Sequence, residues 1–251
     1  MKNRMKQLGI LLVILLMVNI AQNGLSNPKT YFLNMLIALP GIVIGLSFHE
    51  FGHAFVSDRL GDPTPRTQGR VTLNPLAHFD PVGFLALMFC GFGWGIPVEV
   101  NSRYYKHPRR DELLVSLAGV VMNLIVAIVF SFIVHFVYIN VPYAKLSDGT
   151  LMGTLFNILL QVVIVNVVLM VFNLIPVPPL DGFGIITEIF NLREKSFYYT
   201  LYNYGFPILM ILLIVGVVDK ILNPMVTASM HSCCSILFYK IRISQNLHKN
   251  C

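Results

Sequence analysis

A five-residue motif, His49-Glu50-Phe51-Gly52-His53, lies near the end of an apolar segment that runs from Tyr31 to Val56. At about 1.5 Å of rise per helical residue, this segment is long enough to cross a bilayer. On a helix the two histidines are one turn apart on the same face, so both can present a ring nitrogen to one metal ion. Glu50 lies beside them, where a carboxylate can exchange protons with an attacking water. Ionisable residues inside a membrane span are costly and mark function, so the motif predicts hydrolysis at the membrane.

Two other interpretations fit this motif when it is taken alone. The histidines can pack between helices near the membrane interface, or they can hold a metal that has only a structural role. The catalytic interpretation needs a third protein ligand elsewhere in the chain, because a catalytic zinc site has three protein ligands and one open position.

The composition places the motif in a membrane protein. Hydrophobic residues make up 55% of the 251 residues and charged residues 12%, and the mean hydropathy is +0.70. Such values are typical of a polytopic chain in which long apolar runs take most of the length. The net charge of +6 comes from basic residues that cluster in connecting segments. No phosphate-binding loop, finger spacing or basic-aromatic array is present, so we expect no binding to nucleic acid.

The apolar runs predict an all-α polytopic membrane protein with about five to six transmembrane helices. A basic start followed by an apolar run resembles a signal peptide, but no convincing cleavage site follows, so we predict a retained first span. The expected spans are 8–20, 31–56, 113–139, 151–175 and 206–218.

The segment 82–98 is apolar but is interrupted by four glycines and a proline. A run of this kind favours a re-entrant hairpin or an edge ribbon inside the bundle over a full span. We expect residues 1–222 to form a single integral-membrane domain, followed by an irregular C-terminal tail at 223–251.

The distribution of basic residues predicts the orientation of the chain. With a re-entrant 82–98, the segments 1–7, 58–111 and 181–203 lie on one side and hold about twelve of the 18 Lys and Arg. The short links on the other side hold Lys29 and Lys145. The basic side is the cytoplasmic side, so we expect the motif to open toward the cytoplasm.

A proline-rich segment supplies the candidate third ligand. In Phe172-Asn173-Leu174-Ile175-Pro176-Val177-Pro178-Pro179-Leu180-Asp181-Gly182, three prolines end the preceding span and predict an extended chain that delivers Asp181. Asp181 and the histidines then both lie at cytoplasmic ends of spans, where they can meet. Ligation by His49, His53 and Asp181 leaves a fourth position open. The alternative is an ordinary helix-capping aspartate.

These two motifs together resemble the site-2 protease family of intramembrane zinc metalloproteases. The stretch from Gly61-Asp62-Pro63-Thr64 to His78-Phe79-Asp80-Pro81, and Ser116-Leu117-Ala118-Gly119, resemble its small bacterial members without a PDZ domain. The resemblance implies one Zn²⁺ per chain, held by His49, His53 and Asp181, with Glu50 as the base. It also implies cleavage of a membrane-embedded protein substrate within or beside a transmembrane helix, in what we expect to be a bacterial cell membrane. Relatives often have a proline where this chain has Val120, so a helix kink there is in doubt.

Asn123 and Asn173 are candidates to hold the substrate backbone or its oxyanion. The alternative for each is a buried amide that bonds between spans. A substrate helix must unwind to be cut, and the glycine-rich segment 82–98 can pair with the unwound strand by edge addition.

Two other functions remain open at this point: a catalytically inactive membrane scaffold of the same fold, and a divalent-metal transporter. The intact Glu50 disfavours the scaffold, and the lack of internal repeats disfavours the transporter. We expect none of the remaining histidines to be ligands, although His78, near Asp80, is a candidate gate residue whose ordinary alternative is a solvated loop histidine. The remaining histidines are His78, His107, His135, His231 and His248. The sequence specifies neither the substrate nor the oligomeric state.

Overall fold

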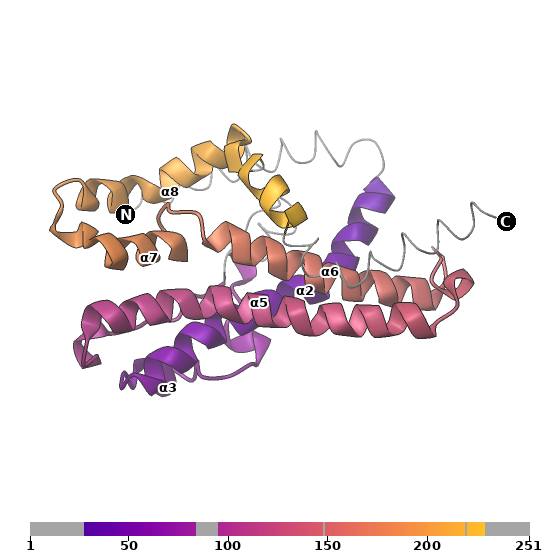
Figure 1. The fold of residues 1–251 in the computed structure, drawn as a ribbon, viewed down its shortest axis with the longest axis horizontal. Helices are drawn as coiled ribbons and strands as arrows, with labels where there is room; N and C mark the ends of the chain where they lie inside the picture. Colours follow the sequence, from indigo (N-terminus) through magenta and orange to yellow (C-terminus); the bar gives the residue numbers. More distant parts are fainter. Residues whose placement is uncertain (1–27, 84–94, 148, 219, 229–251) are drawn as a thin grey trace.

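The computed structural model describes residues 28–83, 95–147, 149–218 and 220–228, and within them it contains helices and no strand (Figure 1). The α-helices are α2 (Pro28–Arg59), α3 (Thr64–Thr67), α5 (Pro108–Asn140), α6 (Leu151–Asn173), α7 (Asp181–Phe190) and α8 (Tyr198–Ile214). Short 3-10 turns are η2 (Pro75–Ala77), η3 (Ser102–Tyr104), η4 (Tyr143–Lys145) and η5 (Leu192–Glu194).

Three long apolar helices, α2, α5 and α6, form the bundle on which the rest of the structure is built. Each of the three packs against the other two, and α7 packs against α5. All three are long and apolar enough to cross a membrane, and α8 is a shorter apolar helix. The predicted all-α polytopic membrane fold is therefore confirmed.

Local sequence signals explain where these helices begin and end. Pro108 occupies the first turn of α5, where its missing amide costs nothing, and the Asp111 carboxylate in the same turn accepts a hydrogen bond from the backbone N–H of His107. Thr150 caps α6 by accepting a hydrogen bond from the Gly153 amide at 2.9 Å. The α6 helix ends at Asn173, three residues before the first proline of the proline-rich segment, as expected.

Small residues on α2 allow its neighbours to approach closely. A Cβ atom on Gly41 would lie 2.8 Å from the backbone oxygen of Gln161 in α6, and one on Gly52 would lie 2.8 Å from that of Ala118 in α5. Helix association in membranes depends on such close packing. The face of α2 that carries these glycines therefore points into the bundle. Gly52 itself lies within the histidine motif, between His49 and His53.

Several predicted segments differ from the structure or lie outside its described residues. The predicted first span, 8–20, and most of the predicted re-entrant segment, at 84–94, lie outside the described residues. Residues 95–100 have no regular secondary structure. The tail beyond 222 was expected to be irregular, but residues 220–228 are helical, so that expectation is wrong for 223–228. The rest of the tail, 229–251, lies outside the described residues.

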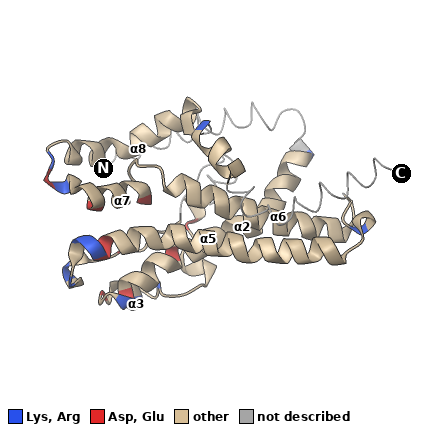
Figure 2. Cartoon of the chain, viewed as in Figure 1, with Lys and Arg blue, Asp and Glu red and all other residues tan. Residues whose placement is uncertain are grey.

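Most charged residues of the described part of the chain lie at one end of the bundle (Figure 2). This end contains α3, the first turn of α5 and the turn between α7 and α8. The apolar lengths of α2, α5 and α6 extend away from it, and exposed apolar side chains such as Phe132 and Phe136 cover the outer face of α5. This distribution fits a bundle whose sides face lipid and whose charged end faces water.

Candidate metal centre and catalytic pocket

The two motif histidines lie on one face of α2, as their spacing predicts. Their Nε2 atoms are 3.1 Å apart, and the side chains of His49 and His53 are only 8% and 12% exposed. Two imidazoles held this close inside an apolar bundle need a charged or metallic partner, because a buried polar atom without one is costly.

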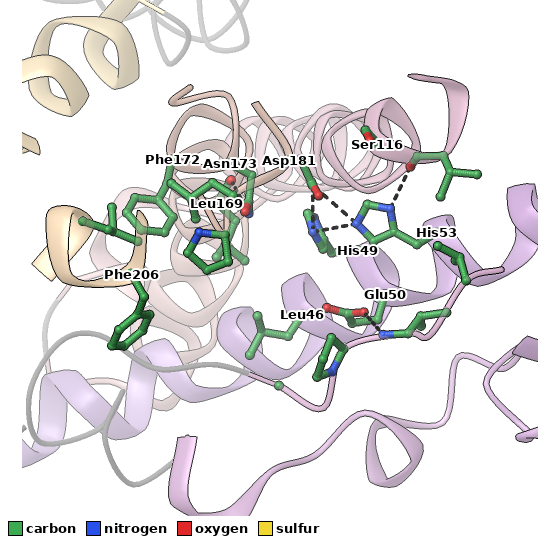
Figure 3. Close-up of a pocket in the computed structure, with 18 residues that line it drawn as sticks. Leu46, His49, Glu50, His53, Ser116, Leu169, Phe172, Asn173, Asp181 and Phe206 are labelled. Atoms are coloured by element: carbon green, nitrogen blue, oxygen red, sulfur yellow. Dashed lines mark hydrogen bonds and ion pairs between the residues drawn. The ribbon is translucent and has the colours of Figure 1, made fainter. Parts of the chain in front are cut away.

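Asp181 provides that partner from the first turn of α7. Its Oδ2 atom lies 3.2 Å from His49 Nε2 and 3.4 Å from His53 Nε2, and the three residues form a group able to hold a metal ion (Figure 3). The chain reaches this point through turns and bends at 174–180. Asp181 is the first residue of α7, but the N-cap position belongs to Leu180 and no side chain caps the helix. The carboxylate points at the histidines instead, which does not match the alternative of a capping aspartate.

The other nitrogen of each histidine is occupied, which fixes how the rings face the site. His53 Nδ1 lies 2.7 Å from the backbone oxygen of Val115, which can only accept a hydrogen bond. His49 Nδ1 lies 2.7 Å from Oδ1 of Asn123. Protein partners at Nδ1 are the usual arrangement for metal-binding histidines, because they leave Nε2 free to ligate.

Two observations show that these residues fit a metal ion. Asp181 Oδ2 is buried and has no hydrogen-bond partner among the described residues, although it points at both imidazoles. The α5 helix also leaves room here, since a Cβ atom on Gly119 would lie 2.5 Å from His53 Nε2 and 2.6 Å from His49 Cε1. Two imidazole nitrogens and one carboxylate oxygen form the kind of donor set that catalytic zinc sites use.

Glu50 lies beside this group without joining it. Its Oε2 atom accepts a hydrogen bond of 3.0 Å from the backbone N–H of Val98, which belongs to the irregular segment 95–100. Figure 3 shows the carboxylate on the pocket side of α2, close to the two histidines. Glu50 therefore lies beside the histidines, where a carboxylate can transfer protons.

The segment that contacts Glu50 is tied to the rest of the chain at both ends. At one end, Ile96 N–H donates to the backbone oxygen of His78 at 2.9 Å. At the other, Asp62 Oδ2 accepts from the Asn101 amide at 2.7 Å and from the Ser57 hydroxyl at 2.9 Å. Burial raises the pKa of Asp62, but hydrogen bonds from Thr64, Asn101 and Ser57 more than offset it, so the pKa lies below its usual value. The carboxylate stays charged and holds this loop to the end of α2.

His78 is buried rather than solvated, which corrects the ordinary expectation for a loop histidine. The residue is 2% exposed, and its Nε2 atom lies 2.9 Å from the backbone oxygen of Thr72. The ring thus fixes the loop whose carbonyl holds Ile96, and it lies outside the His49–His53–Asp181 group.

A pocket of about 550 Å³ opens in front of the three candidate ligands. Its polar side carries His49, His53, Asp181, Glu50 and Ser116, while its other side is apolar (Figure 3). The apolar lining comes from α2, α5, α6 and α8 and the loop segments: Leu46, Pro97, Val98, Val100, Val115, Leu169, Phe172, Pro179, Leu180, Phe206 and Leu209. A polar reaction centre therefore faces a wall suited to apolar side chains.

The far end of α7 is anchored to α5, which holds Asp181 in place. The Arg109 guanidinium donates to the last carbonyls of α7, at Glu188 (2.5 Å) and Ile189 (2.8 Å). Arg193 bridges the carboxylates of Glu188 and Glu112. Cations at a helix C-terminus are favourable for the helix dipole as well as for its free carbonyls. The short helix is thus fixed at both ends.

The two predicted asparagines have different positions. Asn173 lines the pocket, and its Nδ2 donates to the Leu169 oxygen at 3.0 Å. Asn123 is fully buried behind His49 and is not among the pocket-lining residues. The structure therefore does not support direct substrate contact by Asn123; it matches the alternative of a buried amide that bonds between spans.

Sequence reasoning missed several residues of the site. Ser116 lines the pocket, Gly119 leaves the space beside the imidazoles, and Asn166 contacts Asn123. Helical spacing carries a signal for all three, because Ser116, Gly119 and Asn123 repeat at three and seven residues, and Asn166 precedes Asn173 by seven. The backbone contribution of Val98 has no such signal in the sequence.

A helical membrane bundle with a buried His-His-Asp group, an adjacent glutamate and an apolar pocket defines a membrane metallopeptidase. Residues 37–216 match peptidase family M50, and the chain belongs to this family. The predicted site-2 protease family is thereby confirmed.

Two relatives illustrate the likeness. The "Putative zinc metalloprotease YwhC" of Bacillus subtilis (strain 168) is 36% identical over 191 residues, which cover 76% of this chain and 86% of the relative. The "Putative zinc metalloprotease Rip2" of Mycolicibacterium smegmatis is 29% identical over 197 residues, which cover 77% of this chain and 72% of the relative. No solved structure matches the chain significantly.

Gly119→Ala tests whether the space beside the imidazoles belongs to a metal site. The new methyl group would overlap His53 Nε2 and His49 Cε1, so we expect bound zinc to fall about 10-fold or more. Zinc content of protein purified in detergent measures this, and the thermal unfolding of metal-free protein checks the fold. Leu124→Ala, on the outer face of the same helix, is the control and should keep its zinc. Full zinc occupancy in folded Gly119→Ala would contradict this geometry.

Proposed function

We propose that this chain is a zinc-dependent intramembrane endopeptidase that hydrolyses a peptide bond within or beside a transmembrane helix of a protein substrate. The observation that carries the proposal is the common pocket of His49, His53, Asp181 and Glu50, which lies inside a bundle of membrane-length helices. Hydrolysis needs a polar centre, and a membrane-embedded substrate needs an apolar wall beside it.

His49 and His53, through Nε2, and Asp181, through its carboxylate, are the residues that would hold zinc. The names of the relatives support zinc for this site, and the donor set agrees with it. When bound, zinc supplies a Lewis acid that polarises the scissile carbonyl and makes water more acidic. The protein's own contribution is to hold three donors on one side and to leave the pocket side open.

Glu50 is the proposed general base and, later, the general acid. Its carboxylate takes a proton from the attacking water and returns it to the leaving amine. The Val98 amide holds Oε2 at 3.0 Å and so keeps the carboxylate on the pocket side of α2. Its position beside the ligands, rather than among them, supports a role in proton transfer.

The pocket lining indicates how a substrate is held. Apolar side chains of the substrate fit against the wall that includes Leu169, Phe172 and Phe206. The segment 95–100, which has no regular secondary structure and contributes Pro97, Val98 and Val100 to the pocket, is the proposed partner for edge pairing with an unwound strand. Asn173 keeps one amide hydrogen beyond the bond to Leu169, so it can donate to the substrate backbone or to the oxyanion.

Glu50→Gln tests the mechanism directly. Glutamine keeps the shape of the side chain but cannot accept a proton, so we expect full zinc content and a loss of cleavage by about 10²- to 10⁴-fold. Cleavage of a membrane-embedded substrate in detergent or proteoliposomes measures the activity, and metal analysis measures zinc. Wild-type cleavage by zinc-loaded Glu50→Gln would refute the mechanism. If the wild-type protein and Glu50→Gln both bind zinc and neither cleaves any of a panel of membrane substrates, the result would favour an inactive scaffold.

The proposed location is a bacterial cell membrane, with the charged end of the bundle in the cytoplasm. The family and the apolar helices support an integral membrane protein, and the bacterial relatives and the basic residues support the finer assignment.

Cysteine labelling tests this orientation. In a background with the four native cysteines replaced by serine, single cysteines at the exposed positions Thr67, Lys106 and Arg193 should react only from the cytoplasm. A cysteine at Lys145 should react with an impermeant maleimide added to intact cells, because it lies at the opposite end of α5. Labelling of positions 67 and 106 from different sides would contradict the proposed topology.

A further inference from the structure

A chain of buried hydrogen bonds connects the candidate metal site to the interior of all three long helices. Asn123 of α5 contacts His49 of α2 through Oδ1, at 2.7 Å. Its Nδ2 donates to the Gly45 oxygen and to Asn166 Oδ1 of α6, both at 3.0 Å. Asn166 Nδ2 then donates to the Val162 oxygen at 2.8 Å. Both asparagine residues are 0% exposed.

The partners of this chain determine the direction of each hydrogen bond. The Val162 and Gly45 carbonyls can only accept, so each asparagine must turn its NH₂ group toward its carbonyl. Asn166 then offers Oδ1 to Asn123, and Asn123 offers Oδ1 to His49. An oxygen acceptor at His49 Nδ1 requires a proton on that nitrogen. The remaining nitrogen, Nε2, therefore directs its lone pair toward His53 and Asp181.

The fold makes room for these two amides but does not use them in the pocket. A Cβ atom on Gly45 would lie 2.6 Å from Leu169 Cδ1 and 3.3 Å from Asn166 Oδ1, so the glycine permits the contact. Neither asparagine lines the pocket. Two buried amides inside an apolar bundle are costly unless they are fully bonded. Leucine could fill the same space, so packing alone does not explain why these two positions carry amides.

We propose that Asn123 and Asn166 are positioning residues of the metal site. Asn166 orients the amide of Asn123, and Asn123 fixes both the tautomer and the ring orientation of His49. This role presupposes the zinc site proposed above and deepens it. It differs from a merely structural role, in which the amides join three helices and have no specific effect on the metal.

Asn123→Leu and Asn166→Leu test this role through zinc affinity, measured on metal-free protein in detergent by competition with a chromophoric chelator. Loss of an outer partner of a ligating histidine typically weakens metal binding about 10- to 100-fold. We expect that loss in Asn123→Leu, and a smaller loss in Asn166→Leu, where Asn123 keeps its bonds to His49 and Gly45. The double variant should bind zinc no more weakly than Asn123→Leu, because both changes act through one bond. The visible spectrum of the cobalt-loaded protein should also change in Asn123→Leu.

Two matched controls separate positioning from stability. Val134→Ala removes a buried contact between α5 and α6 about three turns away from Asn123, and Asn140→Leu removes an exposed asparagine from α5. Both should keep wild-type zinc affinity, even where Val134→Ala lowers the unfolding temperature. If Asn123→Leu does not fold, the loss of affinity in the milder Asn166→Leu decides the question.

The outcomes are distinguishable from a failure of the proposed function. Wild-type zinc affinity in folded Asn123→Leu, or an equal loss of affinity in Val134→Ala, would overturn the positioning role and leave the zinc site standing. A wild-type protein that binds no zinc would overturn the zinc site itself.

Discussion

Three acceptor atoms meet inside the bundle, and their mutual repulsion is the constraint on which the site depends. His49 and His53 use their Nδ1 protons on Asn123 and Val115, so both Nε2 lone pairs face the Asp181 carboxylate across 3.2 and 3.4 Å. In a medium with little water, these atoms need a positive charge among them. Two imidazole nitrogens and a carboxylate oxygen turned toward one point form a donor set for a cation.

The bundle provides this arrangement by fixing every element around it. The histidines lie on the inner face of α2, Gly119 of α5 leaves space beside them, and α7 brings Asp181 from the far side. The C-terminal end of α7 is bound by Arg109, while the loop beside Glu50 is bound by Asp62 and His78. Rigid surroundings of this kind hold catalytic groups in a reactive geometry without reorganisation during the reaction.

Helical periodicity explains why much of the site could be predicted. The four-residue spacing of His49 and His53 fixes a common face, and the prolines before Asp181 fix where the preceding helix ends. Periodicity does not give the rotation of one helix against another, so it could not decide whether Asn123 faces the substrate or, as in the structure, the rear of His49. It also carries no information on backbone groups, so the bond from the Val98 amide to Glu50 could not be foreseen. The burial of His78 could not be predicted for a related reason, since burial of a loop depends on tertiary packing.

X-ray absorption spectroscopy of the zinc-loaded, full-length protein tests the central claim most directly. Ligation by His49, His53 and Asp181 predicts a first shell of nitrogen and oxygen at about 2.0–2.1 Å, with outer-shell scattering from two imidazole rings. The four cysteines of the chain offer the competing donors. A sulfur shell at about 2.3 Å, or a first shell without imidazole scattering, would contradict the account.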